Sequence, residues 1–406
     1  MAKSYAAVLE IGTTHTVALI GEPLDGGRVR VVGKGLARTT GVRKGIITEI
    51  KQATNGVHAA LTQAADAADV NVGEILLAIS GAHINTSASE GRLPVRATDG
   101  KVTRDDMDEI RDLAAANKPG PDRVILHAIP QFYKLDDLDG ITNPEGMRGK
   151  QLRLGTLFIH GLQERVDDAV NLLKGQDLDT RSVMFSALAA AAAVLTPEQR
   201  NQGVVLIDLG GGTTNYVVFF HNVVVAAGSL GIGGDHVTND IAQAFSISMS
   251  QAEEIKLAEG CAMIDPTRSG RRIELPSTSL TISTARSISV KALHTVMEAR
   301  LRETLTLIRE QVGLELRHAG AGVVFTGGGA YMPRLDELAD RVFGMRARIG
   351  EPLPQYVDNI LDERFRPAML ATTAGLLIRR AQMRDEDGPL SMIGEWFRKS
   401  TKGFAR

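Results

Sequence analysis

Two stretches of the chain, far apart in the sequence, share one pattern of hydrophobic and polar positions. Residues 204–214 (VVLIDLGGGTT) run from an apolar segment into one acid, three glycines and two threonines. Residues 8–15 (VLEIGTTH) repeat this plan with an acid, a glycine and two threonines, and a second apolar segment follows each stretch, at residues 16–20 and 216–220. Continuous apolar runs are typical of buried strands. Each stretch therefore predicts a β-hairpin whose turn points hydrogen-bond donors at one spot.

A third glycine cluster, residues 327–329, follows the apolar run at residues 323–325. Glycines carry no Cβ, so backbone N–H groups in such turns can close on a phosphate chain. Asp208, at the end of its apolar segment, is an oxygen donor of the kind that holds Mg²⁺ through water. We expect the two hairpins to clamp a polyphosphate between two lobes and the third loop to close on the nucleoside. Glycine-rich hairpin turns that bind no ligand are the alternative.

The rest of the pattern predicts alternating helices and strands with one insertion. Apolar positions at helical spacing predict helices at residues 50–68, 103–117, 164–174, 186–195, 237–245, 250–259, 290–317, 335–343 and 367–380. Apolar runs predict strands that include residues 75–80, 124–129, 152–159, 182–185 and 347–349. Prolines gather between residues 86 and 163, where we expect a compact α+β insertion with a polar loop at residues 136–149. Residues 265–279 are polar and poor in strand signals.

The composition limits the classes of protein to consider. With 406 residues, 43% of them hydrophobic and 23% charged, the chain has globular values and is long enough for two or more subdomains. A net charge of −2 creates no overall field that attracts nucleic acid, so we expect no nucleic-acid partner. One cysteine, Cys261, excludes an internal disulfide and fits a reducing compartment. The first residues do not resemble a signal peptide, and the longest apolar run, residues 183–195, is too short to span a bilayer. We therefore expect a cytoplasmic protein.

The last residues carry a second functional pattern. At about 100° per residue, one apolar face collects Leu390, Ile393, Trp396, Phe397 and Phe404, while Arg398, Lys399, Lys402 and Arg406 lie on the other side. Large apolar groups opposite a basic face are typical of a helix that lies in the headgroup plane of a membrane, and tryptophan suits that interface. Residues 381–389 would be a short polar tether. A terminal helix docked on the protein's own core is the alternative.

These motifs resemble those of the actin/Hsp70/sugar-kinase superfamily, and within it the chain is similar to the FtsA family of bacterial cell-division proteins. The resemblance is carried by EIGTT (10–14), AISGAHI (78–84), VILHAIPQ (124–131), DLGGGT (208–213), GGDHVTNDIA (233–242) and TGGG (326–329). It implies an α/β, actin-like two-lobed fold of duplicated RNase H-like domains, with an inserted α+β subdomain and a C-terminal amphipathic helix.

The resemblance also implies a division into subdomains. Lobe 1 (subdomain 1A) would comprise residues 1–85 and 164–200, and the inserted subdomain 1C residues 86–163. Lobe 2 (subdomain 2A) would comprise residues 201–230 and 303–380, with its last helix free to return to lobe 1, and subdomain 2B residues 231–302. The tether (381–389) and the membrane-targeting helix (390–406) would follow.

ATP and Mg²⁺ are the ligands that the resemblance implies. The phosphate contacts would be Gly12, Thr13, Thr14 and His15 in the first hairpin and Gly210, Gly211, Gly212, Thr213 and Thr214 in the second. The nucleoside contacts would be Gly233, Gly234, Glu253, Lys256, Gly327, Gly328, Gly329 and Ala330. Asp208 would hold Mg²⁺ through water. For Glu253 and Lys256, a solvated helix face without a ligand is the open alternative.

Three positions depart from the pattern of active relatives. His15 stands where many relatives have a lysine that contacts phosphate, and imidazole is mostly neutral at pH 7. Asn215 stands where relatives commonly have an aspartate, and the predicted helix that begins at Ser186 carries no carboxylate or glutamine to position an attacking water. We therefore expect ATP binding with weak or negligible hydrolysis, which leaves open whether the protein is an enzyme.

The function implied by the resemblance is that of a peripheral protein on the cytoplasmic side of the cell membrane, at the division septum. It would polymerise there, tether FtsZ filaments by binding the FtsZ C-terminal peptide through 2B, and recruit later divisome proteins through 1C. Membrane lipids would be bound by Leu390, Ile393, Trp396, Phe397, Lys399, Lys402 and Phe404. A PilM-like adaptor of type IV pili, a small-molecule kinase such as a sugar kinase, and an Hsp70-like ATPase are the alternatives.

Overall fold

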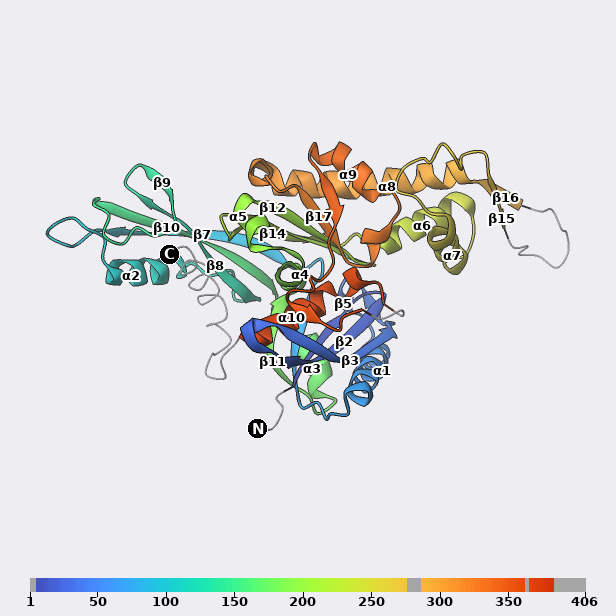
Figure 1. Ribbon diagram of the computed structural model, residues 1–406, viewed down its shortest axis with the longest axis horizontal. Coiled ribbons are helices and arrows are strands. Elements are labelled where there is room, and N and C mark those ends of the chain that lie inside the picture. Colours follow the sequence, from blue (N-terminus) through green and yellow to red (C-terminus); the bar gives the residue numbers. More distant parts are fainter. Residues whose placement is uncertain (1–4, 276–285, 362–364, 383–406) are drawn as a thin grey trace.

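Two mixed sheets with the same arrangement of strands form the centre of the molecule (Figure 1). The structure is a computed structural model that describes residues 5–275, 286–361 and 365–382. The strand order is β11-β6-β1-β2-β3-β19 in the first sheet and β14-β13-β12-β17-β18 in the second. Strands β1, β2 and β3 pair antiparallel, and β6 and β11 continue in parallel from β1. Strands β12, β13, β14, β17 and β18 repeat this arrangement, so the predicted duplication is confirmed.

Both sheets contain the strands that the apolar runs predict, and β3, β14 and β19 are further strands. The first sheet contains β1 (Ala6–Ile11), β2 (His15–Pro23), β3 (Val29–Arg38), β6 (Glu74–Ile79), β11 (Asp179–Phe185) and β19 (Val357–Asp358). The second contains β12 (Val204–Leu209), β13 (Thr214–Phe220), β14 (Val223–Leu230), β17 (Val323–Thr326) and β18 (Ala347–Ile349). A short hairpin, β4 (Val42–Arg43) and β5 (Ile46–Ile47), follows β3.

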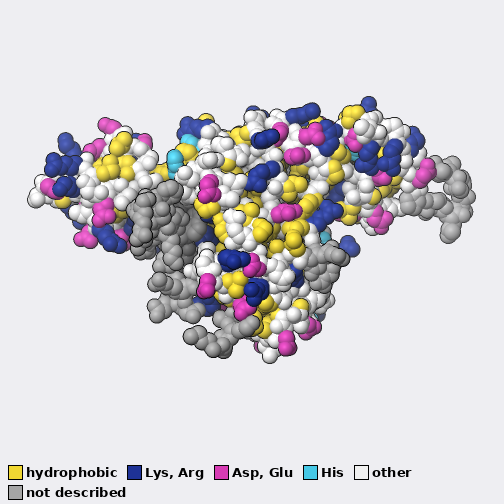
Figure 2. All heavy atoms as spheres, viewed as in Figure 1, with side chains coloured by type: hydrophobic (Ala, Val, Ile, Leu, Met, Phe, Trp, Pro, Cys, Tyr) yellow, Lys and Arg dark blue, Asp and Glu magenta, His cyan; other side chains and the backbone are white. Residues whose placement is uncertain are grey.

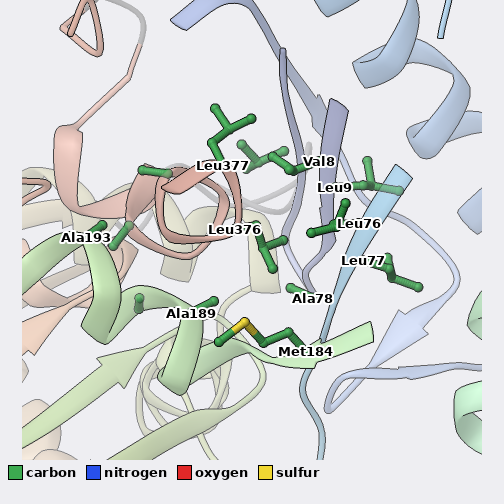
Figure 3. Packing of buried hydrophobic residues seen from close by; sticks show 14 of the residues in the cluster. Val8, Leu9, Leu76, Leu77, Ala78, Met184, Ala189, Ala193, Leu376 and Leu377 are labelled. Atoms are coloured by element: carbon green, nitrogen blue, oxygen red, sulfur yellow. The ribbon is translucent and has the colours of Figure 1, made fainter. Parts of the chain in front are cut away.

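The two sheets are joined by a layer of two helices. The alanine-rich α4 (Ser186–Val194) contacts β12 and β13, and α10 (Ala371–Gln382) contacts α4 and the first sheet. Figure 3 shows Leu376 and Leu377 of α10 beside Val8 and Leu9 of β1. The helices cross closely, because a Cβ added at Gly375 would overlap the backbone of α4. The last helix therefore packs on lobe 1, the first sheet with its helices.

Further helices cover the outer parts of the two sheets. Helix α1 (Ile50–Ala68) packs on β2 and β3, and α3 (Gln163–Lys174) packs on β11. In lobe 2, the second sheet with its helices, the cluster of Val205 and Ile207 includes Leu301 and Leu305 of α8 (Val290–Val312). The remaining short elements of the lobes are η1 (Asp25–Gly27), α5 (Pro197–Gln202), η2 (Gly313–His318), η3 (Gly328–Tyr331), α9 (Leu335–Phe343) and η4 (Pro367–Leu370). Within the described ranges, no helix is both long and apolar enough to cross a membrane.

The insertion projects from one end of the molecule with a core of its own (Figure 1). Its sheet has the order β7-β10-β8-β9, made of β7 (Asn85–Pro94), β8 (Arg123–Leu135), β9 (Leu138–Ile141) and β10 (Gln151–Leu162). Helix α2 (Arg104–Ala114) covers it and begins in a capping box between Thr103 and Asp106. The predicted polar loop at residues 136–149 contains a short strand that was not predicted, because β9 pairs with β8. An edge strand of this kind pairs through its backbone and needs no apolar face.

The opposite end of the molecule carries α6 (Gly234–Phe245), α7 (Met249–Glu259), and a ribbon of β15 (Arg272–Leu275) and β16 (Arg286–Ser289) (Figure 1). Strand β15 corrects the prediction that residues 265–279 are strand-poor. The long helix α8 ends at Val312 rather than at residue 317, because Gly313 adopts φ 55° and the chain tightens into η2. Basic and acidic side chains are interspersed over both lobes on the face shown in Figure 2.

Candidate functional site

Two turns of the same construction face each other across the boundary between the lobes. In the first turn, between β1 and β2, the Gly12 N–H donates to the His15 carbonyl over 3.1 Å. In the second turn, between β12 and β13, the Gly210 N–H donates to the Thr213 carbonyl over 2.9 Å. The same type of hydrogen bond closes both turns because the sequence repeat places a glycine where each hairpin reverses. The residues after the first glycine of each turn, Thr13 and Thr14 in one and Gly211 and Gly212 in the other, therefore face the opposite lobe.

The two turns are in direct contact. A Cβ added at Gly212 would lie 2.7 Å from Thr13 Cγ2, and one added at Gly211 would overlap the Thr14 hydroxyl. The structure thus brings the predicted phosphate residues of both hairpins to one place. Because the turns touch, the lobes must part before a phosphate chain can lie between them.

The start of α6 packs onto the second turn. The N–H groups of Gly234 and Asp235 donate to the carbonyls of Gly210 and Gly211 over 2.9 and 2.8 Å. Asp235 also accepts a 3.5 Å hydrogen bond from the Thr14 hydroxyl of the first turn. The predicted nucleoside residues Gly233 and Gly234 therefore lie beside the second turn, and Asp235 links this segment to the first.

Two acids, the buried Asp208 and the partly buried Glu10, stand just before the turns, in equivalent positions of the repeat. Burial raises the pKa of Asp208 and of Glu10, and the negative charge of Asp208 raises the pKa of Glu10 further. Asn215 lies opposite Asp208 in the β12–β13 pair and hydrogen-bonds to its carboxylate. The Asn215 carbonyl oxygen accepts from Ser229 over 2.7 Å, which orients the amide. Glu10 was not among the predicted site residues, although the internal repeat that aligns it with Asp208 could have identified it.

The third glycine loop closes on the same acid. Gly327 adopts φ 83°, and a Cβ there would overlap the Asp208 carboxylate and lie 2.8 Å from the Leu209 carbonyl. Strand β17 brings the loop to this point, because it runs parallel to β12. Gly328 and Gly329 continue into η3, where Ala330 is fully buried. The predicted adenine loop and the predicted metal ligand are therefore neighbours.

Glu253 and Lys256 form a fixed pair on α7. The Lys256 ammonium lies 2.6 Å from Glu253 Oε2 and donates to the Thr238 hydroxyl over 2.8 Å and to the Gly234 carbonyl over 3.3 Å. The Lys256 side chain is only 8% exposed. These bonds tie α7 to the start of α6, so Lys256 is not on a solvated helix face, whereas the Glu253 side chain is 39% exposed. Whether the pair contacts a nucleoside stays a prediction.

Comparison with known proteins gives one consistent family. A family model described as "Cell division protein FtsA" matches residues 205–375, and one described as "SHS2 domain inserted in FTSA" matches residues 81–160. The chain is 31% identical over 376 residues to the cell division protein FtsA of Neisseria meningitidis serogroup B, covering 92% of this chain and 89% of that relative. It is 32% identical over 392 residues to the cell division protein FtsA of Pseudomonas aeruginosa, covering 95% and 91%. The chain belongs to the FtsA family.

Solved structures agree on the fold of this FtsA-family protein. The "PilM-PilN type IV pilus biogenesis complex" matches with a TM-score of 0.63 at 18% identity, covering 93% of this chain and 99% of that chain. MreB5 of Spiroplasma citri bound to ADP matches with a TM-score of 0.58 at 14% identity, covering 93% and 96%. The actin-like fold with an inserted SHS2 domain is thereby confirmed. Membership of the FtsA family decides against the pilus-adaptor, sugar-kinase and Hsp70-like alternatives.

Two residues of the FtsA-family site that bear on catalysis, His15 and Ser186, carry no charge in the structure. Burial, together with the positive charge of Arg38, lowers the pKa of His15, so the imidazole is neutral at pH 7. Ser186 begins α4 and is fully buried, with no hydrogen-bond partner for its hydroxyl among the described residues. The predicted membrane residues Leu390, Ile393, Trp396, Phe397, Lys399, Lys402 and Phe404 lie outside the described residues.

The acids of the FtsA-family site also limit how a metal can bind. Within the described ranges, no group of three or more His, Cys, Asp or Glu side chains is placed to hold a metal ion. Magnesium is commonly bound by one or two carboxylates together with waters and substrate phosphates. Asp208 and Glu10 fit that mode, because both sit where the two turns and the third loop converge.

Proposed function

We propose that this FtsA-family protein binds Mg-ATP between its lobes and uses the nucleotide to control its assembly on the cell membrane. One observation carries the proposal: two matching glycine turns, each preceded by an acid at the end of a strand, meet across the lobes. Backbone N–H groups at glycine positions can approach a phosphate chain closely. The MreB5 structures bound to ADP and to AMPPNP, which share the fold, support a nucleotide here.

The proposed contacts follow the arrangement of the turns. Residues 12–15 and 210–214 would hold the phosphates, and Asp208, with Glu10 beside it, would hold Mg²⁺ through water. Residues 233–234 and 327–330, with Glu253 and Lys256, would contact the nucleoside. Magnesium would neutralise phosphate charge and keep both acids ionised when it is bound.

Slow turnover is part of the proposal. The attacking water of a phosphoryl transfer has to be oriented by a side chain. The α4 start offers the Ser186 hydroxyl followed by alanines and leucine, and the Asn215 amide is already engaged by Ser229 and Asp208. The nucleotide would therefore act as a switch that is bound for long periods rather than as a fuel that is consumed rapidly.

The cellular role that we propose is that of a membrane tether in division. Residues 390–406 would anchor the protein on the cytoplasmic side of the membrane at the septum, and the protein would polymerise there. The end of the molecule with α6 and α7 would bind the FtsZ C-terminal peptide, and the insertion at the other end would recruit later divisome proteins. Family membership and the apolar and basic faces of the tail sequence support this assignment.

Flotation of FtsZ filaments with liposomes tests this role. Vesicles that contain anionic lipid should carry FtsZ filaments upward only when the full-length protein and Mg-ATP are present. Replacing Trp396 and Phe397 by glutamate should leave both the protein and FtsZ at the bottom, since two charges replace the large apolar groups of the interfacial face. Flotation of FtsZ by this variant, or failure of the wild-type protein to carry FtsZ, would overturn the tethering proposal.

A further inference from the structure

A short hairpin of lobe 1 reaches the boundary between the lobes. It consists of β4 and β5, and its turn contains Lys44, which adopts φ 52°. A lysine rarely adopts this left-handed conformation, so the surroundings must hold it. The Gly45 N–H donates to the Thr13 hydroxyl over 3.1 Å, and the Lys44 carbonyl accepts from the Ala82 N–H over 3.3 Å. The hairpin is thus fastened to the first glycine turn.

The side chain of Lys44 crosses to lobe 2. Its Cδ lies 3.3 Å from the position of a Cβ added at Gly231, just before α6. The charge of Lys44 also contributes, after burial, to lowering the pKa of His236 in the first turn of α6. Lys44 is exposed, and within the described ranges it forms no ion pair. The Lys44 side chain therefore lies at the boundary between the lobes, on the hairpin that is fastened to the first glycine turn.

A second free cation lies on the other flank of the first turn. Arg38 is directly opposite His15 in the β2–β3 pair, so both side chains lie on one face of the sheet. The Thr39 N–H donates to the Thr14 carbonyl over 2.9 Å, which fixes the end of β3 to the turn. Arg38 is exposed and, in the part of the chain that the structure describes, it has no carboxylate partner.

The charges at the site are mostly negative, so a polyphosphate there would need cations that are not already paired. Glu10, Asp208 and Asp235 are acidic, and a polyphosphate would add further negative charge. Lys256 is already paired with Glu253 and bonded to α6. Cations that carry no carboxylate partner keep their charge available for phosphate, and charge-assisted hydrogen bonds to phosphate are the strong ones.

We propose that Lys44 and Arg38 are the side chains that hold the polyphosphate of the nucleotide, so that they make the site prefer nucleoside di- and triphosphates over monophosphates. This inference rests on the proposed nucleotide site and identifies the positively charged side chains that would hold the phosphates there. The hairpin conformation that places Lys44 across the boundary would serve this contact, and Arg38 would bind from the β3 side.

Binding of ATP and AMP to full-length variants in the presence of Mg²⁺ tests the proposal. Lys44→Gln and Arg38→Gln should each weaken ATP binding about tenfold or more, because each removes one charge-assisted contact. The affinity of these variants for AMP should change less than about threefold, which also shows that the site remains folded. Lys44→Arg keeps the positive charge and should retain most of the ATP affinity of the wild type. Lys174→Gln is the matched control, since Lys174 ends α3 at the opposite end of the first sheet from the turns.

The outcomes separate this inference from the proposed function. Wild-type binding of ATP that Lys44→Gln and Arg38→Gln leave unchanged, or equal losses for ATP and AMP, would overturn the inference alone. A wild-type protein that binds neither nucleotide would overturn the proposed function and the inference with it. A selective loss of ATP binding in both variants, with the control unchanged, would establish the inference.

Discussion

Thr13 of the first glycine turn packs directly against Gly212 of the second, although the two residues belong to different lobes. A Cβ at position 212 would lie 2.7 Å from Thr13 Cγ2, closer than carbon atoms pack. Contact between the lobes at this point therefore depends on the missing side chain. The same absence leaves backbone N–H groups accessible once the lobes part.

Gly212→Ala should weaken Mg-ATP binding by about tenfold or more, because the added methyl group occupies the space between the turns. This loss of binding free energy is about that of one charge-assisted hydrogen bond. Gly212 does not have a positive φ, so alanine fits the backbone and the strain falls on the contact with Thr13 between the lobes. Gly73→Ala is the control, because a Cβ there would meet no atom within 4 Å. Equilibrium titration with a fluorescent ATP analogue measures the effect, and equal affinities of the two variants would refute it.

The stability of the protein should fall at mildly acidic pH because of His127. The His127 ring is buried, its Nε2 accepts the Phe185 N–H over 3.0 Å, and burial lowers the pKa of His127 to about 3. In the unfolded chain the pKa of histidine is about 6.5, so between these values the unfolded state binds more protons and stability decreases as pH falls. The loss attributable to this group at pH 5 should be about 2 kcal/mol relative to neutral pH.

Urea unfolding at pH 7 and pH 5 measures the contribution of His127. His127→Gln retains an amide that can accept the Phe185 N–H and has no group that titrates in this range. The variant should be less stable than the wild type at pH 7 and should lose less stability on going to pH 5. An unchanged pH dependence in the variant would show that another group is responsible.

Glu253→Gln should destabilise the protein by about 1–2 kcal/mol, because the mostly buried Lys256 loses its charged partner while the Glu253 side chain is partly solvated. Glu90→Gln is the matched control, since the Arg92–Glu90 pair is well exposed and should contribute less than about 0.5 kcal/mol. Thermal or urea unfolding of both variants provides the comparison. A smaller effect for Glu253→Gln than for the control would mean that the α6–α7 connection does not depend on this pair.

Phosphate release by the purified protein, without added partners, should be slower than about 1 s⁻¹, the low end for phosphoryl-transfer enzymes. The physical reason is that neither the α4 start nor Asn215 provides a free group to orient the attacking water. A malachite-green assay with saturating Mg-ATP gives the rate. Faster turnover would mean that a water-positioning residue exists elsewhere in the site.

Much of the architecture was predictable from hydrophobic pattern. The two hairpins, α1, α4 and α9 follow long apolar runs or strong helical spacing. These patterns are visible in the sequence because the buried face of each element has to be apolar. Strands β9 and β15 gave no such signal, because polar edge strands pair through backbone atoms. The end of α8 at Val312 depends on the backbone conformation of Gly313, which composition alone does not specify.

The identity of the site residues could be predicted from the sequence better than their arrangement in space. Glycines, threonines and Asp208 were identified by type and order, and the repeat placed them in equivalent hairpins. The contact of Gly212 with Thr13 and the link from Gly45 to Thr13 arise from the packing of distant segments, which local periodicity does not encode. The burial of Lys256 likewise depends on how α7 meets α6, so sequence spacing alone left its solvation open.

Calorimetric titration of the protein with ATP, with and without Mg²⁺, tests the central claim most directly. The wild type should bind one ATP with a Kd in the micromolar range, about −8 kcal/mol, in the presence of Mg²⁺. Asp208→Asn should weaken Mg-ATP binding at least about tenfold, and without Mg²⁺ the variant should bind ATP no more weakly than the wild type, because Asp208 favours the nucleotide only through the metal. Absence of ATP binding by the wild type, or equal Mg-ATP affinity in the variant, would contradict a nucleotide and metal site at the meeting point of the two turns.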